Sequence, residues 1–243
     1  MKGPHLENAM SETRHRFSST SRDEKILAFH NSLISSFQSR DLPDYWILSG
    51  WSSIATQRSR FERLLHTSSY GGGSVLDWGC GVGDLYGHLC GTGHDFEYRG
   101  LDVNPRMITI AEKRFGGLFA QVPISYRLTE YYDYVFASGL FQFCDEEMPQ
   151  YYIDMLQNMF TYARRAVAVN FLSSLRDDRD KVNYELYLDP NALVPGLERI
   201  SSRWIVDHSY HPGRADFTVA LIRSSDESRW RRPNFSSDHS FAE

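Results

Sequence analysis

Three alternating glycines are the residues of this chain whose spacing most directly suggests chemistry. The stretch SVLDWGCGVGDL at 74–85 carries an apolar run that ends at Asp77, followed by Gly79, Gly81 and Gly83. In a βαβ unit the first strand-to-helix turn lies at the carboxyl edge of the sheet, where ligands bind. Glycine there lets the backbone adopt positive φ and approach a ligand closely. The stretch therefore predicts a ligand-binding turn, and the alternative is a tight turn that binds nothing.

The next residue, Asp84, bears on the kind of ligand. The dinucleotide-binding pattern GxGxxG would place its last glycine at this position. A carboxylate at a helix N-terminus suits the helix dipole, but it would repel a pyrophosphate bound at the same place. The sequence therefore disfavours NAD and FAD, and it favours a ligand with an adenosine part and no phosphate.

A second acidic residue follows at the expected distance. The segment YRGLD ends at Asp102, 19 residues after Gly83, where a carboxylate can accept hydrogen bonds from both ribose hydroxyls. The alternative is that Asp102 caps a helix that opens at Asn104-Pro105. A later apolar run ends in Ser138 and Gly139, whose small size leaves room for a substrate beside the ligand.

The elements that must position these residues alternate along the chain. After the glycines at 71–73, the hydrophobic pattern predicts strands at 74–78, 97–101, 122–127, 133–138 and 165–171, with helices at 84–90, 105–115 and 146–163. This alternation predicts βαβ units and a parallel sheet in an α/β fold. The apolar runs at 199–207 and 215–223 have only a turn between them, which predicts an antiparallel hairpin.

Helices are also predicted ahead of the glycine turn. Apolar residues at helical spacing predict helices over 23–38 and 54–66, separated by an apolar segment at 45–53. We expect a helical lid over 21–69, an α/β domain over 70–223, and disorder at 1–20 and 224–243. Tyr45, Trp46 and Trp51 are candidates to face a cationic ligand, because aromatic faces attract cations. Alternatively, these side chains pack the lid against the sheet.

Composition excludes several classes of function. With 243 residues, 41% of them hydrophobic, the chain can bury a substantial core, and its net charge of −5 argues against a dedicated nucleic-acid binder. No apolar run reaches the roughly 20 residues that span a membrane, and the first residues carry no signal peptide. Cys80, Cys90 and Cys144 lack paired spacing, which predicts a cytoplasmic protein without a metal site. The oligomeric state stays open.

The glycine turn, Asp102 and the strand ending in Ser138-Gly139 resemble the motifs of class I S-adenosylmethionine-dependent methyltransferases. The resemblance covers residues 70–223. A closer likeness to a bacterial subgroup extends it upstream to GWSS at 50–53, Gln57 and Arg60. It implies a Rossmann-like sheet of order 3-2-1-4-5-7-6 with strand 7 antiparallel, and S-adenosylmethionine as the cofactor.

The resemblance also implies roles for individual residues. Gly79, Gly81 and Gly83 would form the turn around the methionine part of the cofactor, which Asp77 would help orient, and Asp102 would hold the ribose.

In the same comparison, Asn104 and Met107 would lie near the adenine, and Ser138 near the transferred group. Among the aromatic candidates of the lid, Trp51 is expected to contact the cofactor.

This chain departs from the family pattern at three places. No acidic residue follows the predicted third strand before Glu130, so adenine recognition would rest on backbone groups. The related subgroup has His-Asp-Tyr where this chain has HSY at 208–210, and Glu where it has Asp216.

Four residues are candidates for catalysis. Asn170 ends an apolar strand at the ligand edge, where a buried amide must find partners in a substrate or in neighbouring loops. Tyr184 and Tyr187 precede Asp189-Pro190, where a helix is predicted to begin. Each tyrosine either lines a pocket or packs at the surface. His208 and Tyr210 lie in the turn of the final hairpin, where a histidine could remove a proton from an acceptor or be solvated.

Three functions remain open on this sequence. The first is SN2 methyl transfer to a small metabolite, which is the usual activity of the fold and requires an aligned nucleophile rather than acid–base machinery. The second is cyclisation as in an azetidine-2-carboxylate synthase, in which the ligand's amine attacks its own γ-carbon and methylthioadenosine leaves, so no second substrate is needed. The third is non-catalytic binding. RNA and DNA acceptors are disfavoured because the chain has no basic stripe.

Overall fold

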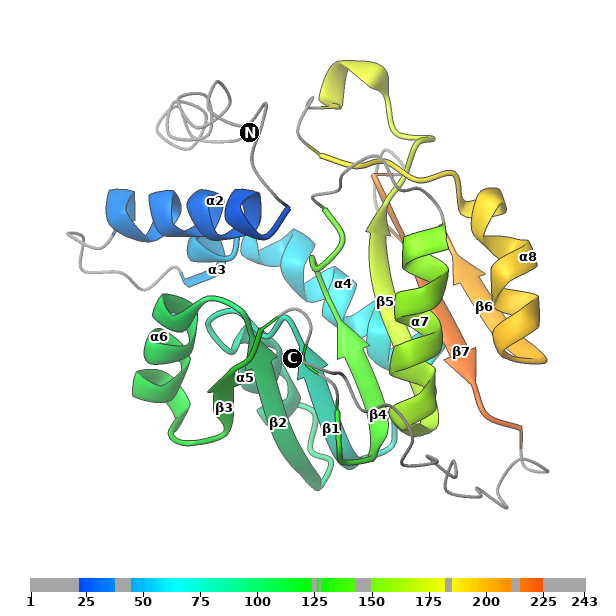
Figure 1. Ribbon diagram of the computed structural model, residues 1–243, viewed down its shortest axis with the longest axis horizontal. Helices are drawn as coiled ribbons and strands as arrows, with labels where there is room; N and C mark the ends of the chain where they lie inside the picture. Colours follow the sequence, from blue (N-terminus) through cyan, green and yellow to red (C-terminus); the bar gives the residue numbers. More distant parts are fainter. Residues whose placement is uncertain are drawn as a thin grey trace, which may run out of the picture.

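The computed structural model describes residues 22–37, 45–123, 126, 128–142, 150–181, 185–210 and 215–224. Its centre is a seven-stranded sheet of order β3-β2-β1-β4-β5-β7-β6 (Figure 1). The strands are β1 (Gly73–Trp78), β2 (Phe96–Asp102), β3 (Phe119–Gln121), β4 (Tyr132–Ala137), β5 (Ala163–Leu172), β6 (Arg203–Asp207) and β7 (Asp216–Ile222). Neighbouring strands from β3 to β5 are parallel, and β7 pairs antiparallel with both β5 and β6. The predicted strand order and reversed strand are confirmed.

Helices cover both faces of this sheet. They are α2 (Arg22–Phe37), α3 (Tyr45–Leu48), α4 (Ile54–Thr67), α5 (Asp84–Cys90), α6 (Pro105–Phe115), α7 (Gln150–Tyr162) and α8 (Pro190–Ile200), with a 3-10 turn at Asp178–Asp180. In Figure 1, α7 and α8 lie in front of β4 to β7, and α4 passes behind the sheet.

Strict alternation along the central strands divides the side chains between these two faces. On β1, Val75 belongs to the apolar cluster under α4 and α5, whereas Leu76 belongs to the cluster under α7 and α8. The same division separates Ala168 from Val169 on β5. Because successive side chains of a strand point to opposite faces, continuous apolar runs are what a sheet buried on both sides requires.

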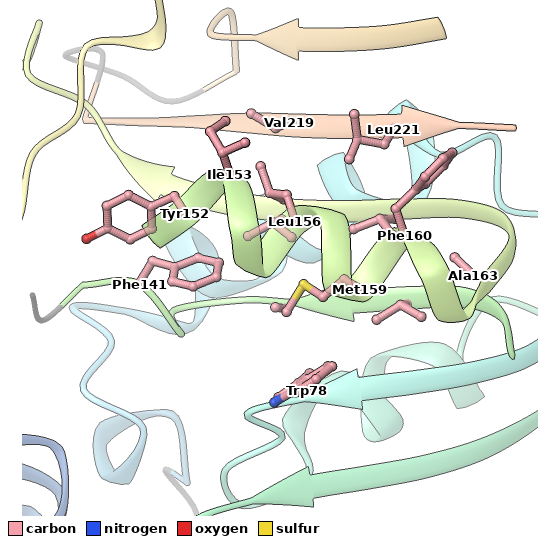
Figure 2. Close-up of a cluster of buried hydrophobic side chains, with 14 of the residues drawn as sticks. Trp78, Phe141, Tyr152, Ile153, Leu156, Met159, Phe160, Ala163, Val219 and Leu221 are labelled. Atoms are coloured by element: carbon pink, nitrogen blue, oxygen red, sulfur yellow. The ribbon is translucent and has the colours of Figure 1, made fainter. Parts of the chain in front are cut away.

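The larger cluster lies under α7. Figure 2 shows Leu156 and Phe160 of α7 pointing toward Val219 and Leu221 of β7. Helix α8 approaches α7 very closely at Gly196, where an added Cβ would lie 2.2 Å from Cδ1 of Ile153. The glycine therefore sets the spacing of the two helices on this face.

Most element boundaries agree with the sequence predictions, and one strand does not. The helices at 84–90 and 105–115 match α5 and α6. The predicted strand at 122–127 is wrong, because β3 runs over Phe119–Gln121. Val122 still donates to Asp102 O, but Pro123 has no N–H and cannot extend the ladder.

Smaller corrections concern the second half of the chain. The helix predicted at 146–163 is α7 at Gln150–Tyr162, and residues 146–149 lie outside the described part. Residues 199 and 200 belong to α8, so β6 begins at Arg203. Asp189 caps α8 through Asn191 N, as the Asp-Pro pair predicted.

The N-terminal helices pack against the carboxyl edge of the sheet at α6. Phe29 and Leu33 of α2 share an apolar cluster with Met107. Asn104 Nδ2 donates to Asn31 Oδ1 across 3.1 Å, and Arg106 donates to the Asn31 carbonyl across 3.2 Å. These contacts place α2 over the ligand edge, where a lid was predicted. Of the segments predicted to be disordered, 1–20 and 224–243, all residues except 224 lie outside the described part. No helix within the described part is long and apolar enough to cross a membrane.

Candidate active site

The glycine turn after β1 is tied to the end of β2. Gly79, Gly81 and Gly83 have φ of +82°, +54° and +83°, a region that favours glycine. The amide nitrogens of Gly79 and Cys80 donate to the Leu101 carbonyl across 2.8 and 3.0 Å. The turn is therefore held against β2 by backbone hydrogen bonds.

Gly83 differs from the other two glycines. It is the N-cap of α5, and an added Cβ would lie 2.9 Å from Cζ of Phe119 and 3.0 Å from Cδ2 of Phe115. Gly79 and Gly81 line the central cavity described below, and Gly83 does not. The structure accordingly explains Gly83 by packing between α5, α6 and β3.

Asp102 organises the turn. Its Oδ2 accepts from Gly81 N across 2.9 Å, and its Oδ1 accepts from Asn104 N across 2.8 Å. The N-cap of α6 is Asn104, whose side chain accepts from Arg106 N, so the alternative assignment of Asp102 as the cap is wrong. Burial raises the pKa of Asp102, and its backbone hydrogen bonds oppose the rise.

A cavity of about 1050 Å³, counting space open to solvent, lies above this turn. We call it the central cavity. Seven of the nine residues predicted to bind the cofactor line it: Trp51, Asp77, Gly79, Gly81, Asp102, Met107 and Ser138. Asn104, only 1% exposed, and Gly83 do not, because both are committed to helix starts.

Asp77 brings a second buried carboxyl group to the cavity. It is 3% exposed, and its Oδ2 accepts from the Tyr98 hydroxyl across 2.6 Å. Burial raises the pKa of Asp77 to about 7, the hydrogen bond from Tyr98 opposes this, and the charges of Asp102 and Asp84 add to it.

Asp84 links the turn to the N-terminal segment. Its Oδ1 pairs with Arg114 Nη1 across 2.7 Å, and its Oδ2 accepts from Gln57 Nε2 across 2.8 Å. Asp84 also lines the central cavity. A carboxylate stands where a dinucleotide-binding turn would need room for phosphate, as the sequence predicted.

Trp51 separates the central cavity from a second hollow of about 670 Å³, which we call the adjoining pocket. Trp51 and Gly139 line both, and an added Cβ on Gly139 would lie 3.3 Å from Trp51 Cζ2. The Arg60 guanidinium lies 4.6 Å from the Trp51 ring centroid. Tyr45 and Trp46, the other aromatic candidates, line neither hollow.

A hydrogen-bond chain runs from the central cavity into β5 and β7. Ser138 Oγ donates to Asn170 Oδ1 across 2.8 Å, and Asn170 Nδ2 donates to Thr218 Oγ1 across 2.7 Å. Thr218 in turn lies 3.0 Å from the Tyr210 hydroxyl. Asn170 lines the adjoining pocket, but its amide is already bonded within the chain. These contacts favour the structural alternative for Asn170, although its amide joins β7 to the residue after β4 rather than two loops.

The other catalytic candidates are not brought to either hollow. Tyr210 is half-buried beside Asn170, and desolvation together with the charge of Asp216 raises its pKa, so its hydroxyl stays protonated at neutral pH. The His208 ring packs edge-on against Phe217 with 6.1 Å between centroids, and it lines neither the central cavity nor the adjoining pocket. Tyr184 lies outside the described residues.

Sequence reasoning missed residues that α2 and α4 contribute. Ile26, His30 and Gln57 line the central cavity. Burial lowers the pKa of His30 to about 4, so its imidazole is neutral at physiological pH. The available signal was the spacing of Ile26 and His30, four residues apart on the predicted helix and therefore on one face.

Comparisons with known proteins agree with this geometry. A family profile described as a methyltransferase domain matches residues 75–159. The Mycobacterium tuberculosis protein named "Putative methyltransferase Rv1506c" is 31% identical over 158 residues, which are 63% of this chain and 94% of that protein.

Two solved structures share the fold at low sequence identity. The DhpI-SAH complex superposes with a TM-score of 0.57 and 17% sequence identity. The match covers 84% of this chain and 97% of the DhpI chain. Magnesium protoporphyrin IX methyltransferase from Synechocystis PCC 6803 with bound SAM has a TM-score of 0.56 and 16% sequence identity. That match covers 85% of this chain and 99% of the methyltransferase chain. Because the mycobacterial relative is matched over nearly its whole length and the sheet has the family's strand order, the chain belongs to the class I S-adenosylmethionine-dependent methyltransferases, whose cofactor is S-adenosylmethionine.

Proposed function

We propose that this chain transfers a methyl group from S-adenosylmethionine to a small metabolite held in the adjoining pocket. The observation that carries the proposal is the junction at Trp51 and Gly139, where the central cavity meets a second hollow of small-molecule size. A cofactor above the glycine turn and an acceptor beyond Trp51 would then be neighbours.

The residues around the central cavity fit this cofactor. Asp77 and Asp102 place two carboxyl groups where a ligand with an ammonium and a sulfonium group would gain from negative charge. Asp84 opposes phosphate at the same turn, and S-adenosylmethionine has none. Asp102 would face the ribose, while Met107, Val122 and Pro123 supply an apolar wall for the adenine.

The chemistry requires alignment more than proton transfer. When bound, S-adenosylmethionine would supply an electrophilic methyl carbon. The acceptor's lone pair would bond to that carbon, the electron pair of the broken carbon–sulfur bond would stay on sulfur, and the acceptor's proton would be lost to bulk solvent before transfer or as the product leaves. Ser138, whose hydroxyl is held by Asn170, would orient the reacting groups where the central cavity meets the adjoining pocket. Trp51 would exclude water from this junction. Asn170 and Tyr210 would act as positioning residues.

The test is incubation with S-adenosylmethionine deuterated in its methyl group, alone and with a small-molecule extract, followed by mass spectrometry. We expect S-adenosylhomocysteine and a deuterated small product in equal amounts, and only with the extract. Methylthioadenosine together with a cyclic amino acid, formed from the cofactor alone and faster than in a buffer control, would contradict the proposal, because it would mean cyclisation. Deuterium recovered in protein or nucleic acid would also contradict it.

A further inference from the structure

Two opposite charges line the adjoining pocket without neutralising each other. Arg176 and Glu185 are both half-buried residues of its wall. Within the described part of the chain, the Arg176 guanidinium makes no ion pair or hydrogen bond, and the Glu185 carboxylate accepts only from the Tyr187 hydroxyl. A half-buried guanidinium lacking an internal partner is suited to an anionic ligand.

The backbone holds both residues in place. Arg176 N donates to the Ser173 carbonyl across 3.2 Å, just beyond β5. Leu186 N donates to the Gln142 carbonyl across 3.0 Å, which fixes the residue next to Glu185 against the loop after β4. The two charged groups therefore sit on loops already tied to the sheet, so binding a ligand would cost little ordering of these segments.

The rest of the pocket wall is aromatic, uncharged and polar, or carries charges that neutralise each other. Trp51, Phe141 and Phe171 line it, and the Phe141 and Phe171 rings stack with 5.2 Å between centroids. Arg60 and Asp216 also reach the pocket, but they pair with each other across 2.5 Å. The charges available to a ligand are thus one cation and one anion beside an aromatic wall.

We propose that the acceptor is an amino acid, with its carboxylate on Arg176, its amino group on Glu185 and its side chain along the wall formed by Phe141 and Phe171. This inference rests on the proposed function and names the substrate class of the same site. A ligand with only a carboxylate would leave Glu185 desolvated with no cationic partner, and a ligand with only an amine would leave Arg176 desolvated with no anionic partner. Each loss costs a charged hydrogen bond, worth roughly tenfold or more in affinity.

The test separates acceptor binding from turnover. The proteinogenic L-amino acids are titrated singly by calorimetry into the protein saturated with S-adenosylhomocysteine. For the tightest binder, the decarboxylated amine and the deaminated acid are titrated in the same way. We expect at least one amino acid to bind, and each single-charge analogue to bind at least about tenfold more weakly.

Variants then assign the two contacts. Arg176→Gln should weaken the amino acid about tenfold or more and leave the decarboxylated amine unchanged, whereas Glu185→Gln should weaken the amino acid and leave the deaminated acid unchanged. Arg179→Gln, on the exposed ion pair with Asp177 in the same loop, is the matched control and should change neither.

Three results would overturn the inference. They are no binding by any amino acid, equal binding of the single-charge analogues, or weaker S-adenosylhomocysteine binding in Arg176→Gln, which would mean that Arg176 holds the cofactor's own amino-acid arm. If S-adenosylhomocysteine itself fails to bind the unaltered protein, the proposed function fails first, and the two failures are thereby distinguished.

Discussion

Tyr98 on β2 donates its hydroxyl hydrogen to Asp77 on β1 across 2.6 Å, at the wall of the central cavity. The bond stabilises the ionised carboxylate, but burial outweighs it and raises the pKa of Asp77 from its ordinary value of 3.8 to about 7. In the unliganded protein, Asp77 is therefore a group that resists ionisation.

This predicts a specific pH dependence of stability. Because the folded-state pKa is the higher one, the unfolded chain ionises first, and Asp77 removes stability as pH rises from about 4 to about 7. The side chain of Asp77→Asn cannot ionise, so this variant does not lose that stability. The difference between its melting temperature and that of the unaltered protein should therefore increase from about pH 4 to about pH 7 and level off at higher pH. A difference that is constant from pH 4 to pH 8 would show that Asp77 ionises normally.

Arg60 and Asp216 form a buried ion pair between α4 and β7, with side chains 9% and 1% exposed. We expect Arg60→Ala to lower the free energy of unfolding by about 3–5 kcal/mol, because it leaves the Asp216 carboxylate buried without its cation. Chemical denaturation at neutral pH measures this loss.

A matched control lies one turn along the same helix. Arg63 pairs with Asp207 across 2.9 Å, but these side chains are 26% and 16% exposed, and Asp207 also accepts from Ser209. Arg63→Ala should therefore cost about 1 kcal/mol. Equal losses in the two variants would refute the assignment of the Arg60 pair as the structural one.

The close approach of α7 and α8 at Gly196 gives a prediction about packing. An alanine there places Cβ 2.2 Å from Cδ1 and 2.5 Å from Cγ1 of Ile153. Overpacking costs about 1–3 kcal/mol, and the gain in helix propensity offsets about 1 kcal/mol of it. We expect Gly196→Ala to lower the melting temperature by several degrees. Gly117→Ala, where no heavy atom lies within 4 Å of the added Cβ, should leave the melting temperature nearly unchanged, and an equal fall in both would contradict this account.

The sequence predicted the parts of the site that depend on local pattern. The glycine turn and Asp102 were found because strand, turn and helix follow one another in the chain, and a parallel sheet brings such turns to one edge. The strand order came from the family resemblance rather than from periodicity. The short strand β3 was missed because its three residues, Phe119–Gln121, are too few to show the alternation of apolar and polar side chains that identifies a strand.

The parts that depend on distant contacts could not be predicted. His30 reaches the central cavity only because α2 packs on α6, partly through the Asn31–Asn104 hydrogen bond, and no local pattern encodes this packing. Asn170 was placed at the ligand edge correctly, but its bonds to Ser138 and Thr218 join three strands whose side-chain contacts the sequence does not show. Gly83 and Asn104 fit the motif, yet the structure uses both for helix starts.

The most direct test of the central claim is calorimetric titration of S-adenosylmethionine into the protein and into Asp102→Asn. Asp95→Asn is the matched control, since Asp95 is exposed and precedes the other end of β2. We predict that the unaltered protein and Asp95→Asn bind equally and that Asp102→Asn binds at least about tenfold more weakly, because Asp102 is the proposed charged acceptor for the ribose hydroxyls. Equal affinity in all three proteins would contradict the placement of the cofactor above the glycine turn.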